Sequence, residues 1–233
     1  MGERMPDYGA GFYRQHARRY AEVSRLGLQS RYLESTHPRL RGDQDLIERL
    51  KELVPPPARG LDAGCGAEAR DVAHLHACGY EVEGLDAVPE VLETARRAHP
   101  EVADRLHLRD LREGLDLPDA CLDFLLCNAV IQHIEPEAVF GTVLPEFARA
   151  LKPGGVLLLM FKEGKGVLRV YDRDYGVERA FLLYEPEEVD RRLQELGLHL
   201  IPPEGEALGG LMRFLDPKGV WHAVGFWRKA RGV

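Results

Sequence analysis

The chain has 233 residues, of which 45% are hydrophobic and 30% charged, proportions that are ordinary for a globular protein. Its formal net charge of -7 argues against a nucleic-acid partner, because the phosphate backbone demands a basic surface. No apolar run approaches the roughly 20 residues of a membrane-spanning helix, and Met1 to Arg19 lack the apolar core of a signal peptide. We therefore expect one α/β domain over residues 1–233, with no membrane partner and a cytoplasmic location.

The first 54 residues predict an N-terminal helical cap. Residues 8–33 contain two tyrosine-bearing amphipathic turns, Tyr13 to Tyr20 and Leu26 to Leu33. A second helix is expected to begin at Gly42-Asp43, with Asp43 as its N-cap, and to continue to about residue 53. The prolines at 55–57 then end this helix.

Residues 55–162 alternate strand-like apolar runs with helical stretches. The expected strands are Arg59–Ala63, Glu81–Leu85, Leu106–Arg109, Leu122–Cys127 and Gly155–Phe161. The expected helices are Ala67–Cys78, Pro89–Ala98 and Glu135–Leu151. This βαβα order predicts a mainly parallel sheet that is covered by helices on both faces.

The pattern changes after residue 161. Residues 162–166 are typical of a charged, glycine-rich loop, and a strand is expected at Val177–Leu183. Proline in the first turn and two glutamates near the positive end of the dipole predict a helix over Pro186–Leu196. Leu198–Ile201 and Trp221–Trp227 are expected to be closing strands. The four cysteines form no C-x-x-C pair, and His74 and His76 diverge on a helix, so no metal is expected.

Residues 60–71 read Gly-Leu-Asp-Ala-Gly-Cys-Gly-Ala-Glu-Ala-Arg-Asp. A strand that turns through glycines into a helix lets the backbone approach a ligand and directs free N–H groups at it. Gly64-x-Gly66-x-x-Ala69, followed by Asp86, fits the fingerprint of a dinucleotide cofactor. Asp62 favours instead a cofactor with an amino group and a sulfonium, because a carboxylate attracts a cation and repels a pyrophosphate.

Further segments follow this loop in the order and spacing of one family. They are Leu85-Asp86-Ala87, Arg109-Asp110-Leu111, residues 122–134, residues 147–155, Tyr13 to Tyr20, and Tyr184 to Gly197. With the loop, they make the chain resemble the class I S-adenosylmethionine-dependent methyltransferases over nearly its whole length. The resemblance implies a Rossmann-like sheet of seven mostly parallel strands in the order 3-2-1-4-5-7-6, with the last strand antiparallel. Residues 55–162 would be the cofactor-binding core, and residues 163–233 the acceptor side with the closing strands.

The resemblance also implies how S-adenosylmethionine would bind. Asp86 would accept hydrogen bonds from both ribose hydroxyls, and Asp110 would accept one from the adenine amine. The loop after the fourth strand would face the methyl donor, and the segment that ends at Tyr20 would close over the cofactor. The implied cofactor-binding residues are Asp62, Gly64, Cys65, Gly66, Asp86, Ala87, Asp110, Leu111, Asn128, Ala129, His133 and Tyr20.

The loop departs from the family pattern at Glu68, which occupies the position of a third glycine. A glutamate does not adopt positive φ freely, but it suits the first turn of a helix, where the dipole favours an anion. Two arrangements follow. Either the helix starts at Ala67 and Glu68 turns to solvent, which we favour, or Glu68 faces the ammonium of the ligand.

Methyl transfer from a sulfonium is an in-line displacement, so the protein mainly aligns a nucleophile and excludes water. A base is needed only if the acceptor must lose a proton. His133 is the candidate catalytic base, with a structural histidine as the alternative. Cations after the fifth strand could bind an anionic acceptor, or could form a solvated loop with aromatic packing. These cations are Lys162, Lys165, Arg169 and Arg179, and the aromatic residues near them are Tyr171, Tyr175 and Tyr184.

Three functions remain compatible with the sequence. The first is transfer of a methyl group to a small molecule, with S-adenosyl-L-homocysteine as the product. The second is methylation of RNA or protein, and the third is binding of S-adenosylmethionine without catalysis. The acidic charge and the absence of a basic appendage favour the first over an RNA enzyme. An NAD-dependent oxidoreductase is disfavoured by Asp62.

Overall fold

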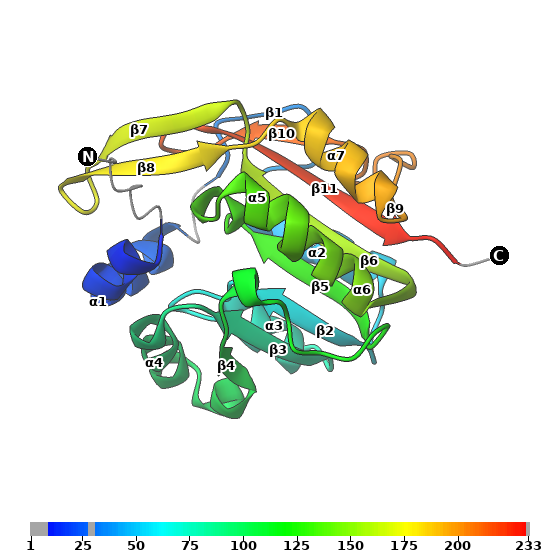
Figure 1. The fold of residues 1–233 in the computed structure, drawn as a ribbon, viewed down its shortest axis with the longest axis horizontal. Helices are drawn as coiled ribbons and strands as arrows, with labels where there is room; N and C mark the ends of the chain where they lie inside the picture. Colours follow the sequence, from blue (N-terminus) through cyan, green and yellow to red (C-terminus); the bar gives the residue numbers. More distant parts are fainter. Residues whose placement is uncertain (1–8, 28–30, 232–233) are drawn as a thin grey trace.

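Five parallel strands form the centre of the molecule (Figure 1). The computed structural model describes residues 9–27 and 31–231. The parallel strands are β2 (Arg59–Ala63), β3 (Glu81–Asp86), β4 (Leu106–Leu108), β5 (Leu122–Asn128) and β6 (Leu151–Lys162), in the spatial order β4-β3-β2-β5-β6. β5 and β6 are largely buried on both faces, which explains why they read as continuous apolar runs. Apart from the start of β6, the predicted boundaries differ from these by at most one residue.

The other half of the sheet is antiparallel. β11 (Trp221–Lys229) pairs with β6, with β9 (Leu198–Leu200) and with β10 (Met212–Leu215), and β10 in turn pairs with β1 (Glu34–Ser35). The path β4-β3-β2-β5-β6-β11-β9 confirms the predicted order 3-2-1-4-5-7-6 with an antiparallel closing strand. β1 and β10 extend the sheet to nine strands, and neither of these short strands was predicted.

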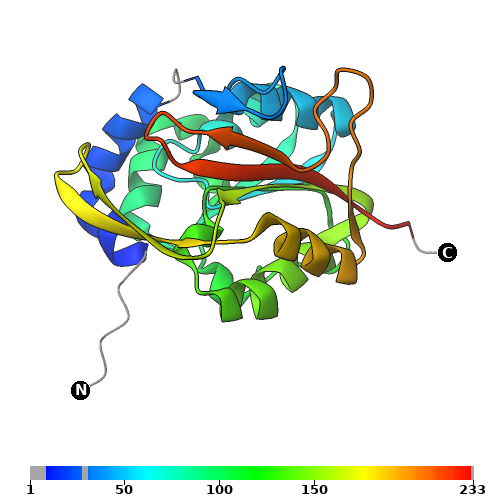
Figure 2. The same cartoon turned by 90° about the horizontal axis from the view of Figure 1, so that it is seen from above.

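Helices cover both faces of the sheet (Figure 2). One core cluster packs α2 (Asp43–Leu53), α3 (Arg70–Ala77) and α4 (Pro89–Ala98) against the sheet. The opposite cluster packs α6 (Leu144–Ala150) and α7 (Pro186–Glu195). The sheet therefore lies between two helical layers, as the βαβα pattern predicts. None of the described helices has the length and apolarity that crossing a membrane requires.

Three helical segments differ from the predictions in their N-cap, their first residue or their continuity. The N-cap of α2 is Gly42, and Asp45 rather than Asp43 accepts from the backbone N–H groups of Arg41 (2.7 Å) and Gly42 (3.1 Å). α3 begins at Arg70 instead of residue 67. The helix expected over residues 135–151 is divided into α5 (Pro136–Ala138), a π-helical turn (Val139–Val143) and α6. Pro145 lacks an N–H group, which accounts for the irregular winding just before it.

A helix and a hairpin lie together at one end of the sheet (Figures 1 and 2). The helix is α1 (Ala10–Gly27), and the hairpin pairs β7 (Gly166–Asp172) with β8 (Val177–Leu183). Arg19 Nε donates to the carbonyl of Asp174 in the hairpin turn (2.8 Å). α1 provides the predicted helical cap, whereas the second predicted turn, residues 26–33, lies partly outside the described residues. β7 was not predicted, since only one of its residues is buried.

Candidate functional site

A cavity of about 800 Å³ opens at the carboxyl ends of the parallel strands. Ligands of open α/β sheets bind at this edge, and the volume is typical of small-molecule sites. Each parallel strand contributes lining residues at or just after its end, while α1, the β7–β8 hairpin and the β10–β11 turn close the other sides. Nine of the twelve implied cofactor residues line this cavity: Tyr20, Gly64, Asp86, Ala87, Asp110, Leu111, Asn128, Ala129 and His133.

Gly64 presents bare backbone to the cavity, and Gly66 follows it in the same loop. Gly64 has φ +104°, and a Cβ atom there would lie 2.3 Å from the side chain of Val130. Gly66 has φ +67°, and a Cβ atom there would lie 2.8 Å from the hydroxyl of Tyr20. Both positions therefore require glycine for conformation and for space. Ala69, which caps α3, takes the third left-handed conformation of the loop (φ 38°).

Glu68 lies in the turn before α3 and not in its first helical turn, because the helix begins two residues later. Its carboxylate pairs with Arg25 of α1 at 3.0 Å. Glu68 does not line the cavity, and only 12% of its side chain is exposed. The favoured prediction of a solvent-facing Glu68 is thus wrong, since the side chain joins the loop to the helical cap.

The remaining three implied residues, Asp62, Cys65 and Gly66, do not line the cavity. Asp62 is buried in β2, and burial, followed by the neighbouring Asp71 carboxylate, raises its pKa. Burial also raises the pKa of the Cys65 thiol. Asp62 precedes the two glycines and Cys65 lies between them, so both belong to the loop without lining the cavity.

Asp86, at the end of β3, lies between the loop and α4. Its carboxylate accepts from the backbone N–H groups of Gly66 (3.2 Å) and Val88 (3.0 Å). Burial raises the pKa of Asp86 to about 6, although these hydrogen bonds oppose the shift. The Tyr20 hydroxyl lies over the same loop, and burial raises its pKa as well.

Asp110, after β4, is held by Arg112. The guanidinium donates to both carboxylate oxygens, at 3.0 Å from Nε and 2.6 Å from Nη2. Burial acts to raise the pKa of Asp110, but the Arg112 hydrogen bonds hold it below its ordinary value. The carboxylate keeps lone pairs for one further donor, since two oxygens offer about four acceptor sites.

Asn128 ends β5 with an unsatisfied acceptor. Its Oδ1 atom is buried and has no hydrogen-bond partner among the described residues, while the residue lines the cavity. The next residue, Ala129, has φ 57°, which is uncommon for a side chain other than glycine. A buried acceptor at a cavity wall fits a ligand that carries an N–H or ammonium donor.

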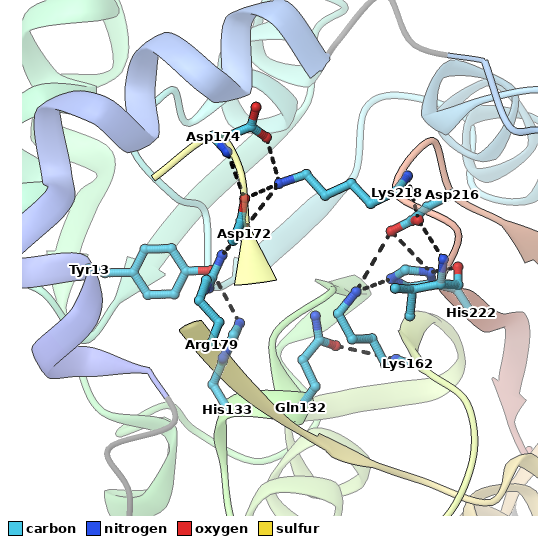
Figure 3. Close-up of polar contacts among 11 residues, drawn as sticks. Tyr13, Gln132, His133, Lys162, Asp172, Asp174, Arg179, Asp216, Lys218 and His222 are labelled. Atoms are coloured by element: carbon cyan, nitrogen blue, oxygen red, sulfur yellow. Dashed lines mark hydrogen bonds and ion pairs between the residues drawn. The ribbon is translucent and has the colours of Figure 1, made fainter. Parts of the chain in front are cut away.

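His133 lies in a short 3₁₀ helix (Ile131–His133) that follows β5 and contacts α1. The Tyr13 hydroxyl accepts from Arg179 Nη2 (2.8 Å) and lies 3.3 Å from Nε2 of His133 (Figure 3). Because Arg179 has no acceptor, the hydroxyl proton is available to His133. The Arg179 guanidinium also stacks on the rings of Phe12 (4.0 Å) and Phe181 (4.6 Å).

Of the four predicted acceptor-side cations, Lys162 and Arg179 line the cavity, whereas Lys165 and Arg169 do not. Arg179 also pairs with Asp172 at 3.2 Å. Among the aromatic residues, Tyr171 lines the cavity, and Tyr184 is buried and donates to the carbonyl of Ile134. The predicted charged loop is therefore partly a cavity wall.

Sequence reasoning missed the polar groups around these cations, which are Gln132, Asp172, Asp174, Asp216, Lys218 and His222 (Figure 3). Gln132, Asp216 and His222 lie 30 or more positions from Lys162, whereas Asp172 lies seven positions from Arg179. His222 faces Lys162 because β11 pairs with β6 in the register that places these two residues opposite each other. The antiparallel pairing of β6 with β11 brings His222 next to Lys162, and no local sequence pattern reveals this pairing.

Residues 61–159 match the family model of a methyltransferase domain. The trans-aconitate 2-methyltransferase of Azoarcus sp. strain BH72 is 34% identical over 129 residues, which are 55% of this chain and 47% of that protein. The tRNA 5-carboxymethoxyuridine methyltransferase of Escherichia coli K12 is 31% identical over 133 residues, or 54% of this chain and 48% of that protein. The chain spans about half the length of the curated relatives it matches.

The fold also matches solved structures. The 1,6-didemethyltoxoflavin-N1-methyltransferase of Burkholderia thailandensis, solved with S-adenosylhomocysteine bound, aligns with a TM-score of 0.60 at 20% identity. The match covers 97% of this chain and 93% of that one. At 20% identity this similarity shows that the two proteins share a fold, and no more.

Proposed function

We propose that this chain, which belongs to the class I S-adenosylmethionine-dependent methyltransferase family, transfers a methyl group from S-adenosylmethionine to a small-molecule acceptor. The single observation that carries the proposal is the buried, unsatisfied Oδ1 of Asn128 in the wall of a cavity that bare glycine backbone also lines. The cofactor offers donors for such an acceptor, and it needs a close backbone approach.

The residues present fit this cofactor. Asp86 would accept from the ribose hydroxyls, Asp110 would accept from the adenine amine, and the backbone at Gly64 would approach the amino-acid portion. Tyr20 covers the loop from α1 and excludes water. When bound there, S-adenosylmethionine supplies an activated methyl group, so the task of the protein is to orient an acceptor and keep the cavity dry.

The acceptor would occupy the end of the cavity between α1, the hairpin and β11. Lys162, Arg179 and Lys218 line this end, which favours an anionic acceptor, while the net charge of -7 disfavours a nucleic acid. His133 is the candidate base for an acceptor that has a proton to lose. Such a proton would reach it through the Tyr13 hydroxyl, which lies 3.3 Å from Nε2.

The Escherichia coli relative, by its name, acts on tRNA, so RNA is the second candidate acceptor. A protein acceptor and cofactor binding without catalysis are further alternatives. The hairpin and α1 close over the cavity, and this enclosure supports a small molecule over a polymer.

Two measurements test the proposal. Isothermal titration should detect binding of S-adenosylmethionine and no binding of NAD. Release of S-adenosylhomocysteine should then be measured over a metabolite panel and over bulk tRNA. Tight NAD binding without S-adenosylmethionine binding would overturn the cofactor assignment. Turnover with tRNA alone would replace the small-molecule acceptor by RNA.

A further inference from the structure

The acceptor end of the cavity contains a buried lysine whose charge is only partly neutralised. Lys162 is the last residue of β6, and 9% of its side chain is exposed. Its ammonium lies 3.1 Å from Nε2 of His222 and 3.7 Å from the carboxylate of Asp216. We propose that this ammonium, with the side-chain amide of Gln132, binds the anionic group of a carboxylic acid acceptor. The inference rests on the proposed function, because it names the class of acceptor for the same cavity.

Of the other cations at this end, Arg173 is exposed, and Arg179 and Lys218 have closer anionic partners than Lys162 has. Arg179 lies 3.2 Å from the carboxylate of Asp172, and Lys218 lies 2.9 Å from Asp172 and 2.6 Å from Asp174. The partner of Lys162 is both more distant and shared. Oδ1 of Asp216 accepts from two backbone N–H groups of its own turn, those of residues 218 and 220. An anionic ligand would therefore neutralise the buried charge of Lys162 more than that of Arg179 or Lys218, which already have close carboxylates.

His222 orients the ammonium without neutralising it. Burial, followed by the charge of Lys162, lowers the pKa of His222 to about 4, so the ring is neutral near pH 7. Its Nδ1 lies 3.1 Å from the carbonyl of Val220 and donates there, which leaves Nε2 to accept from Lys162. The ring is stacked on Phe214, with centroids 5.0 Å apart and planes 5° from parallel. One donor of the ammonium is thus fixed on His222 while the others remain available.

Gln132 supplies a second donor beside Lys162 (Figure 3). Its Oε1 accepts from the backbone N–H of Lys162 at 3.4 Å. Because the oxygen of the Gln132 amide makes this contact, the amide nitrogen, Nε2, is the atom left to donate. Both residues line the cavity, and Gln132 is 3% exposed. A carboxylate has two oxygens and can accept from the ammonium and the amide together, whereas a primary amide would bring its own N–H donors to a site that already has donors.

The charge of the cavity wall agrees with this assignment. The carboxylates at the acceptor end are Asp172, Asp174 and Asp216. The cations outnumber them by one and are Lys162, Arg173, Arg179 and Lys218. S-adenosylmethionine adds a further net positive charge, because its sulfonium is not balanced. A cationic acceptor would meet repulsion here, and an anion would meet attraction.

Binding to the S-adenosylhomocysteine complex of the full chain tests the inference without turnover. The probes are benzoate, glutarate and citrate, each compared by calorimetry with the corresponding primary amide. We expect at least one acid to bind about tenfold or more tightly than its amide, since a hydrogen bond to a charged group contributes roughly 1.5–3 kcal/mol. Lys162→Met should abolish this preference. Lys165→Met is the matched control, because its side chain is 84% exposed and lies outside the cavity.

A pH series gives a second measurement that does not depend on the variant folding. Burial lowers the pKa of Lys162 to about 8, and Asp216 opposes the shift while Arg179 and Lys218 add to it. Acid affinity should therefore be constant below about pH 7 and should fall as the pH rises through about 8, because the ammonium loses its proton there. The inference is wrong if no acid binds, if amides bind as well as acids, or if Lys162→Met retains the acid preference. Acid binding at Lys162, together with no release of S-adenosylhomocysteine over the whole metabolite panel, would support the site and refute the proposed methyl transfer.

Discussion

Replacement of Gly64 by alanine should destabilise the protein by two separable effects. The backbone there has φ +104°, and an alanine held in such a conformation costs about 1–3 kcal/mol. The new Cβ would also lie 2.3 Å from Cγ2 of Val130, and an overpacked contact costs about 1–3 kcal/mol. We therefore expect Gly64→Ala to lower the free energy of unfolding by about 2–6 kcal/mol. It should also weaken S-adenosylmethionine binding, because both residues line the cavity.

A double-mutant cycle in urea separates the two effects. Val130→Ala should remove the collision and recover about 1–3 kcal/mol in the Gly64→Ala background, so the two changes should not be additive. Gly197→Ala is the control for backbone strain alone, because Gly197 has φ +78° and a Cβ atom added there would meet no described atom within 4 Å. A Gly64→Ala variant no less stable than Gly197→Ala would refute the collision, and additivity with Val130→Ala would refute the contact.

Two further changes concern the cofactor end. Because the pKa of Asp86 is raised to about 6, its carboxylate is half protonated at that pH and loses acceptor capacity. S-adenosylmethionine affinity should therefore be constant above about pH 7 and should fall as the pH drops through about 6. Asp86→Asn should weaken binding roughly 10- to 100-fold at pH 8 and abolish this pH dependence, which calorimetry would detect. Glu68→Gly should change the S-adenosylmethionine affinity less than twofold and the free energy of unfolding by at most about 1 kcal/mol, as should Arg25→Ala, because the pair is partly exposed. A tenfold loss of affinity in Glu68→Gly alone would indicate contact with the ligand.

The central strands could be predicted because their signals are local. Leu122–Asn128 and residues 155–162 are largely buried apolar runs, which local sequence reveals. The hairpin strand Gly166–Asp172 was missed because its residues are mostly exposed or half-buried and give no apolar face. The start of α3 was placed too early since Ala67 and Glu68 favour a helix, whereas the chain uses them for the loop that leads to Arg70.

The acceptor end could be predicted only in part. The position of Lys162 after a buried strand marked it as a candidate, but its polar partners come from residues 60 and 54 positions later in the chain, His222 and Asp216. A register shift of one residue in β11 would turn His222 to the other face of the sheet. Local pattern therefore identifies the cations, and only the antiparallel pairing shows which of them lacks a close counter-ion.

The role of His133 depends on which group of the acceptor is methylated. If it is the carboxylate bound at Lys162, the attacking oxygen has no proton to lose, and a base contributes nothing to the transfer. His133 would then hold Tyr13, and through it α1, over the cavity. We expect His133→Gln and Tyr13→Phe each to lower kcat less than about tenfold, since loss of a general base typically costs 10²–10⁴-fold. Single-turnover rates with the best acid would measure this. A loss above 100-fold in His133→Gln, with a new pH dependence of kcat, would show that a proton is removed and that His133 accepts it.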